Sequence, residues 1–157
     1  TSDGPKLIEY NARFGDPEAM NVLPLLKTPL AEVCQAIVDG TLDKVEFEDK
    51  ASVCKYIVPD GYPETQYAGE LIEVDEEAIE DLGAKVFYAA VSKEDDGIHL
   101  SGSRALGIVA SGETIEEAEK IAEKACEFVK GNVYHRRDVG TKDLVQKRVE
   151  HMKEILN

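Results

Sequence analysis

Five short runs of β-branched and aromatic residues in the last two thirds of the chain constrain its fold most. The runs cover residues 52–58, 70–74, 85–92, 97–101 and 104–110. Proline, glycine and aspartate turns separate them, and Asp95-Asp96-Gly97 is typical of a hairpin turn. Strands joined by short turns pair in the antiparallel sense. We therefore expect a small, mostly antiparallel sheet.

Two helices are expected to pack on this sheet. Thr114 followed by Glu117 forms a capping box, and apolar residues then recur at helical spacing up to a stop at Gly131-Asn132. These residues are Ile115, Ala118, Ile121, Ala122, Ala125, Phe128 and Val129. A second stripe of Leu144, Val145, Val149, Met152, Ile155 and Leu156 predicts a terminal helix. The pattern predicts an α+β domain over residues 51–157.

The first 50 residues follow a different pattern. Residues 6–10 are typical of a strand, and residues 17–26 predict a helix that kinks or ends near Pro24. Thr28-Pro29 begins a clearer helix, and Gly40 stops it. The apolar stripe of that helix is Leu30, Val33, Cys34, Ile37 and Val38. Residues 41–50 are polar and acidic, so we place a domain boundary between residues 50 and 51.

Charge and hydropathy exclude some classes of partner. The formal net charge of −14 argues against a nucleic-acid or anionic-membrane surface, because both need basic patches. No apolar run approaches the roughly 20 residues that span a bilayer, and the acidic start is no signal peptide. The first five residues resemble a loop within a longer chain, so we expect this sequence to be a fragment.

The three cysteines, Cys34, Cys54 and Cys126, lie far apart and without paired spacing. Cys34 and Cys126 fall on the apolar faces of predicted helices. We interpret them as reduced, buried thiols of a cytoplasmic protein rather than as a disulfide or a zinc site.

The densest group of chemically capable residues lies between Ile8 and Glu18. Glu9 and Asn11 are two apart on a predicted strand, so they point to the same side. A carboxylate and an amide oxygen suit a hard cation such as Mg²⁺. Arg13 has a planar guanidinium that fits carboxylate or phosphate. Asp16-Pro17 is typical of a helix N-cap and first turn. Solvated side chains before an ordinary helix remain the alternative interpretation.

A second candidate is the loop Gly102-Ser103-Arg104, which lies between two predicted strands. Its backbone N–H groups and its guanidinium suit a phosphate or a carboxylate, although a plain hairpin with a solvated arginine is the alternative. The run 135–138 is interpreted as structural, with Asp138 pairing an arginine. The sequence has no phosphate-binding loop, dinucleotide fingerprint, zinc pair or protease-like triad.

The run from Glu9 to Glu18, EYNARFGDPE, resembles the signature of the phosphoribosylamine–glycine ligase family, also called glycinamide ribonucleotide synthetases. Further motifs follow the family's order and approximate spacing: LPLL at 23–26, DGYP at 60–63, VFYA at 86–89, SRALG at 103–107, the helix entry at 112–118 and HRRDVG at 135–140. Met20 replaces a polar residue usual in the family, and Ser103 replaces a glycine. The resemblance implies that residues 1–50 form the C-terminal edge of an ATP-grasp domain and residues 51–157 the C-terminal domain.

The family joins glycine to 5-phosphoribosylamine in de novo purine biosynthesis, with ATP as co-substrate and glycyl phosphate as intermediate. The resemblance assigns Glu9 and Asn11 to Mg²⁺ or Mn²⁺ binding and Arg13 to catalysis. It assigns Arg13, Gly15, Asp16, Ser103 and Arg104 to substrate binding. It further implies that upstream lobes of the same polypeptide are needed, so this part alone is expected to be inactive. Another ATP-grasp carboxylate–amine ligase and a non-catalytic interaction or lid module remain alternatives.

Overall fold

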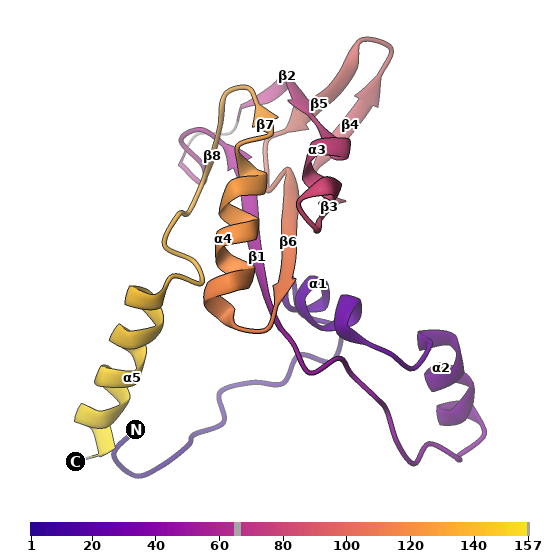
Figure 1. Ribbon diagram of the computed structural model, residues 1–157, viewed down its shortest axis with the longest axis vertical. Helices are drawn as coiled ribbons and strands as arrows, with labels where there is room; N and C mark the ends of the chain where they lie inside the picture. The colour runs from indigo at the N-terminus through magenta and orange to yellow at the C-terminus, as the bar shows by residue number, and fades with distance from the viewer. Residues whose placement is uncertain (65–66, 157) are drawn as a thin grey trace.

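The computed structural model describes residues 1–64 and 67–156, and these form two four-stranded antiparallel sheets with helices around them (Figure 1). The first sheet has the order β3 (Ala84–Tyr88), β6 (Leu106–Gly112), β1 (Ala51–Pro59) and β8 (Val133–His135). The second has the order β4 (Val91–Glu94), β5 (Gly97–Ser101), β2 (Ala68–Val74) and β7 (Val129–Lys130). The expected α+β class and the antiparallel pairing are confirmed.

The predicted strand over residues 85–92 is in fact two strands. β3 pairs with β6 in the first sheet, whereas β4 pairs with β5 in the second. Between them, the N–H groups of Ala89 and Ala90 donate to the carbonyl oxygens of Ala105 and Arg104, at 2.8 and 2.9 Å. A continuous run of this composition is typical of a strand, but it does not show that the chain changes sheets inside the run.

α4 (Ile115–Cys126) covers one face of the first sheet, lying against β1 and β6 (Figure 1). The Thr114 hydroxyl caps its first turn by accepting from the N–H of Glu117 at 3.2 Å. Its buried face consists of Ala118, Ala122, Ala125 and Cys126. These small side chains let the helix approach the strands closely. They form one core with Ile57, Leu106 and Ile108 of the sheet.

The predicted end of this helix near Gly131 was wrong, because the helix ends at Cys126. Val129 then pairs with Val74 as part of β7. The β-branched side chain suits a strand, and Val129 is buried at the edge of the second sheet. The pattern also missed α3 (Glu76–Asp81), which Asp75 caps by accepting from the N–H of Ala78 at 3.0 Å.

A buried lysine ties β1 to α4. The side chain of Lys55 is fully buried, and its Nζ lies 2.7 Å from Glu119 Oε1 and 2.6 Å from Glu123 Oε2. Nζ also donates to the carbonyl oxygen of Arg137 at 3.0 Å. Burial alone lowers the pKa of Lys55, but the hydrogen bonds and charges of the two glutamates outweigh it and raise the pKa above the ordinary value. Lys55 is therefore a buried cation with three partners.

The two N-terminal α-helices differ in their contact with the sheets. α1 (Glu18–Val22) continues into the 3-10 turn η1 (Leu23–Leu25), so the helix predicted over 17–26 is interrupted next to Pro24, as expected. α1 packs on β1 and β6, and the Asn21 side chain donates to Ser52 Oγ at 3.0 Å. α2 (Leu30–Val38) lies away from both sheets (Figure 1). The boundary between residues 50 and 51 stays a prediction.

Two local expectations near the N-terminus were wrong. Residues 6–10 form no strand, and Ile8 is 95 % exposed. A strand needs a neighbour for its backbone hydrogen bonds, and no described strand lies beside this segment. Asp16 is not the N-cap of α1. Pro17 holds that position, without a side-chain cap, because the Asp16 carboxylate bonds to Tyr56 and Arg104 instead.

The cysteines divide into two kinds. Cys54 and Cys126 are buried free thiols, as predicted, but Cys34 is exposed, so its predicted burial was wrong. The reason is that the apolar stripe of α2 faces solvent, with Ile37 59 % and Val38 81 % exposed. The terminal helix α5 (Lys142–Leu156) forms as predicted but buries no residue. None of the helices in the described residues is long and apolar enough to cross a membrane.

Candidate functional site

Asp16, Tyr56 and Arg104 come together from three distant parts of the chain. The Tyr56 hydroxyl donates to Asp16 Oδ1 at 2.5 Å, and Arg104 Nη2 donates to Asp16 Oδ2 at 2.9 Å. The Arg104 guanidinium carbon lies 4.9 Å from the centroid of the Tyr56 ring, within cation–π range. We call these residues the Asp16 cluster. Two of them, Asp16 and Arg104, are predicted substrate-binding residues.

Strand geometry sets the place of Tyr56. Side chains alternate along β1, so Lys55 and Ile57 face α4 while Cys54, Tyr56 and Val58 face the opposite side. Asp16 reaches that side because it lies two residues before α1, which packs on β1. The Arg104 loop is held by the next residue, since Ala105 N–H donates to the Ile57 carbonyl oxygen at 2.9 Å.

The charges of the Asp16 cluster favour a fixed carboxylate. Burial, followed by the hydrogen bond to Asp16, raises the pKa of Tyr56 well above its usual range, so the hydroxyl stays a donor. Burial, and then the Asp16 charge, raise the pKa of the neighbouring Cys54 thiol to about 12. A carboxylate offers about four acceptor positions, and Tyr56 and Arg104 use only two. The cluster can therefore still accept hydrogen bonds from an ammonium or amine group.

A cavity of about 510 Å³ opens beside this cluster. Its walls are largely apolar and aromatic, and Tyr56 belongs to both the cavity and the Asp16 cluster. The lining consists of Pro17, Cys54, Tyr56, Val58, Tyr62, Pro63, Tyr134, Arg136 and Val139. The DGYP and HRRDVG runs of the sequence thus meet at one cavity. As predicted, Asp138 pairs with an arginine: Arg136 Nη2 lies 2.7 Å from its Oδ2.

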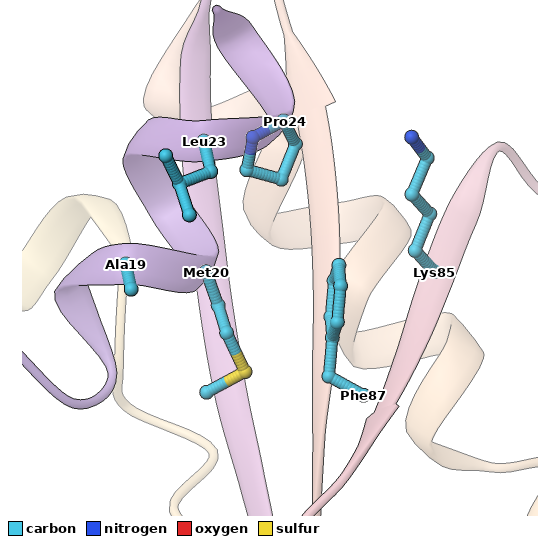
Figure 2. Close-up of a pocket in the computed structure, with 6 residues that line it drawn as sticks. All are labelled: Ala19, Met20, Leu23, Pro24, Lys85 and Phe87. Atoms are coloured by element: carbon cyan, nitrogen blue, oxygen red, sulfur yellow. The ribbon is translucent and has the colours of Figure 1, made fainter. Parts of the chain in front are cut away.

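A second, apolar pocket of about 350 Å³ lies where α1 and η1 meet β3 (Figure 2). Figure 2 shows Met20 and Leu23 on the helical side and Phe87 on the strand side. A Cβ atom added to Gly107 of β6 would lie only 2.9 Å from Met20 Sδ. Met20 therefore packs α1 closely onto the sheet.

The other predicted site residues are not brought into the Asp16 cluster. Glu9, Asn11 and Arg13 are exposed, and Arg13 Nη1 donates to the neighbouring Phe14 carbonyl oxygen at 2.9 Å. Gly15 directly precedes Asp16, and its carbonyl oxygen accepts from the N–H of Ala19 at 2.9 Å. Ser103 is exposed beside Arg104. The prediction that Glu9 and Asn11 point to the same side required a strand over residues 6–10, which the structure lacks.

Tyr56 was missed by the sequence reasoning. The run 52–58 was recognised as a strand, and its alternation places Tyr56 on the face opposite Lys55. That pattern identifies the face of β1 opposite α4, but it does not identify Asp16 and Arg104, 40 and 48 residues away in the sequence, as partners.

A separate cluster lies at the turn between β4 and β5. Ligand atoms of Glu94, Asp96 and His99 all lie within 4.8 Å of one another. His99 Nδ1 lies 2.9 Å from the Gly69 carbonyl oxygen, and Nε2 lies 2.8 Å from Asp96 Oδ1. Both hydrogen bonds raise the pKa of His99, and the bond to the Gly69 carbonyl has the larger effect. The imidazole therefore ties the hairpin to β2.

Comparison with known proteins adds three findings. Residues 52–142 match the family model described as phosphoribosylglycinamide synthetase, C domain. The chain is 87 % identical over 157 residues to a phosphoribosylamine–glycine ligase of Methanobrevibacter smithii, covering 36 % of that protein. It is 57 % identical over 155 residues to the protein of that name from Methanothermobacter thermautotrophicus, again covering 36 % of its length.

A solved structure also resembles this chain over most of its length. It is the crystal structure of a phosphoribosylamine–glycine ligase from Thermotoga maritima, with a TM-score of 0.71 and 29 % sequence identity. The match covers 85 % of this chain and 33 % of that one. The chain thus spans about a third of the length of the proteins it matches.

Proposed function

The chain belongs to the phosphoribosylglycinamide synthetase C-domain family, and we propose that it forms the C-terminal part of an ATP-dependent ligase. That ligase joins glycine to 5-phosphoribosylamine and yields glycinamide ribonucleotide, ADP and phosphate in the cytoplasm. The ion pair between Asp16 and Arg104 is the structural observation that most supports this proposal. It joins the EYNARFGDPE and SRALG runs, which resemble ligase motifs, at one place.

The chemistry of the proposed reaction explains its need for ATP. A glycine carboxylate is a poor electrophile, because neither of its oxygens is a leaving group. Transfer of the γ-phosphoryl group of ATP to one carboxylate oxygen gives glycyl phosphate and ADP. The amine of phosphoribosylamine then attacks the carbonyl carbon, and phosphate leaves with that oxygen. Asp16 is our candidate for binding the glycine amino group.

Glu9, Asn11 and Arg13 are the candidates for handling phosphate charge. The carboxylate of Glu9 and the amide oxygen of Asn11 are both exposed, and hard oxygen donors of this kind fit Mg²⁺ or Mn²⁺. When bound, such an ion supplies positive charge that offsets the charge of the ATP phosphates. Arg13 would stabilise the transferring phosphoryl group or hold the glycine carboxylate.

The exposed apolar residues around these candidates support a role within a larger protein. Leu7, Ile8, Tyr10 and Phe14 are all more than half exposed. We propose that upstream lobes of the same polypeptide cover them and give residues 6–10 their missing strand partner, as at the edge of an ATP-grasp domain. Those lobes would supply most of the ATP site, so residues 1–157 alone are expected to be inactive.

A chimera tests the proposal. In it, this chain replaces the matching 36 % of the Methanobrevibacter smithii relative, and we call this protein the chimeric ligase. ADP release is followed by a coupled assay with ATP, glycine and phosphoribosylamine. We expect turnover near that of the unmodified relative and none when either glycine or phosphoribosylamine is omitted. An inactive chimera, or ADP release that needs neither compound, would contradict the proposal.

A further inference from the structure

We propose that Tyr56 is a positioning residue that holds the Asp16 carboxylate in place to receive the amino group of glycine. This inference rests on the proposed function and adds to it a residue that the sequence motifs do not contain. It starts from the arrangement of the Asp16 cluster, in which each oxygen of Asp16 has its own donor.

The two donors fix the orientation of the carboxylate. Tyr56 holds Oδ1 and Arg104 holds Oδ2, so the Asp16 side chain cannot rotate without breaking a hydrogen bond. The Asp16 side chain is 50 % exposed, which leaves it open to a ligand. Without the Tyr56 hydroxyl, the carboxylate would keep only one anchor and sample other rotamers, with a loss of pre-organisation for binding.

Tyr56 itself is held firmly. Its backbone lies in β1, which is paired with β6 on one side and with β8 on the other. Its ring lines the 510 Å³ cavity and supports the Arg104 guanidinium at 4.9 Å. Tyr56, on a strand that is paired on both sides, therefore helps to position both the Asp16 carboxylate and the Arg104 guanidinium.

The chain offers a matched control for the hydroxyl. Tyr88 on β3 also donates to a carboxylate, Glu76 Oε1, at 2.7 Å. Burial and that hydrogen bond raise its pKa in the same direction as that of Tyr56. Tyr88 is not part of the Asp16 cluster, so Tyr88→Phe removes an equivalent hydrogen bond from outside the site.

The test compares Tyr56→Phe with Tyr88→Phe in the chimeric ligase. For Tyr56→Phe we expect the KM for glycine to rise about five- to tenfold, the loss expected for one hydrogen bond of ordinary net strength. The kcat should change by less than about twofold, because the lost interaction acts in ground-state binding as well as in the transition state. The KM for ATP should not change. Tyr88→Phe should leave all three constants unchanged.

A second variant keeps the test decisive if Tyr56→Phe lowers stability. Asp16→Asn should raise the KM for glycine at least as much, and adding Tyr56→Phe to it should raise the KM no further, because the Tyr56 hydroxyl acts only through the Asp16 carboxylate and Phe keeps the ring beside Arg104. A glycine KM unchanged in Tyr56→Phe, or independent effects of the two substitutions, would overturn the inference. Failure of the proposed function is distinct from both outcomes, since the chimeric ligase without substitutions would then lack glycine-dependent ADP release.

Discussion

At the scale of single residues, Asp16 shows what a motif can and cannot predict. The resemblance to a ligase family marks Asp16 and Arg104 as site residues, and the structure places them 2.9 Å apart. The local pattern predicts a helix cap at Asp16, which was wrong, because a partner on β1 and another before β6 bind its oxygens. A cap is a local contact that sequence spacing can predict, whereas these partners depend on the packing of α1 against the sheet.

Glu9 is the residue whose charge matters most in the proposed metal site. We expect Glu9→Gln to lower the kcat of the chimeric ligase by roughly 100-fold or more, because a neutral amide is a weaker ligand for a hard divalent cation. Glu32→Gln, an exposed glutamate on α2, is the control and should have no effect. The measurement is turnover across a Mg²⁺ titration. Normal turnover with an unchanged Mg²⁺ dependence in Glu9→Gln would rule out this role.

The cysteines give a residue-scale test of the fold. Cys34 is exposed, while burial raises the pKa of both Cys54 and Cys126 to about 12. Since the thiolate is the reactive form, iodoacetamide at neutral pH should label Cys34 first. The other two should react only after unfolding in denaturant. Peptide mass spectrometry reads the order, and equally fast labelling of Cys126 in the native chain would contradict the packing of α4 on the sheet.

At the scale of elements, alternation and capping signals predicted most of the strands and both long helices. The wrong predictions concern residues whose structure depends on distant pairing partners. The chain passes between the two sheets at Ala89 and Ala90, and Val129 belongs to a strand rather than to the helix. The strand predicted over 6–10 has the right composition but lacks a pairing partner. Periodicity shows which face is apolar, and tertiary pairing determines whether the element forms.

Lys55 should be the main ionic link between β1 and α4. We expect Lys55→Met to lower the free energy of unfolding by about 2 kcal/mol, because it leaves Glu119 and Glu123 without their shared cation in a mostly buried site. The matched control is Lys120→Met, which removes an exposed pair with Glu116 on the same helix and should cause no measurable change. Urea denaturation measures both, and equal stabilities would show that the buried pairs contribute nothing net.

The same network makes a pH-dependent contribution through Glu123. Burial alone raises the pKa of Glu123, but hydrogen bonds from Lys55 and His135 outweigh it, so the net shift is below the ordinary 4.5. A carboxyl group whose pKa is lower in the folded state stabilises the fold above its unfolded pKa. That stability is lost as the pH falls below 4.5 through the folded pKa.

Glu123→Gln should therefore make the folding stability less sensitive to acid. Between about pH 5 and pH 3, the urea midpoint should fall less in Glu123→Gln than in the unmodified chain. Glu32→Gln, at an exposed position of α2, serves as the control for loss of a carboxylate. Parallel pH dependences for the unmodified chain and Glu123→Gln would contradict the coupling of Glu123 to Lys55.

At the scale of the whole molecule, the two parts of the chain differ in how well they are covered. The sheets and α4 enclose one core, whereas residues 7–47 expose large apolar side chains. These include Leu7, Ile8, Tyr10, Phe14, Val22, Leu30, Ile37, Val38, Leu42 and Phe47. Exposure on this scale is typical of an interaction surface. It agrees with a chain that spans about a third of its relatives, and the sequence alone could not show which apolar faces stay uncovered.

In the proposed reaction, this chain helps a ligase to activate the carboxylate of glycine. To test this directly, the chimeric ligase is given glycine labelled with ¹⁸O in both carboxylate oxygens. The mass of the released phosphate is then determined by mass spectrometry. Because one of those oxygens leaves with the phosphoryl group, each phosphate should carry one ¹⁸O atom, and the other should stay in the amide product. Release of unlabelled phosphate during turnover, or no phosphate at all, would contradict the claim.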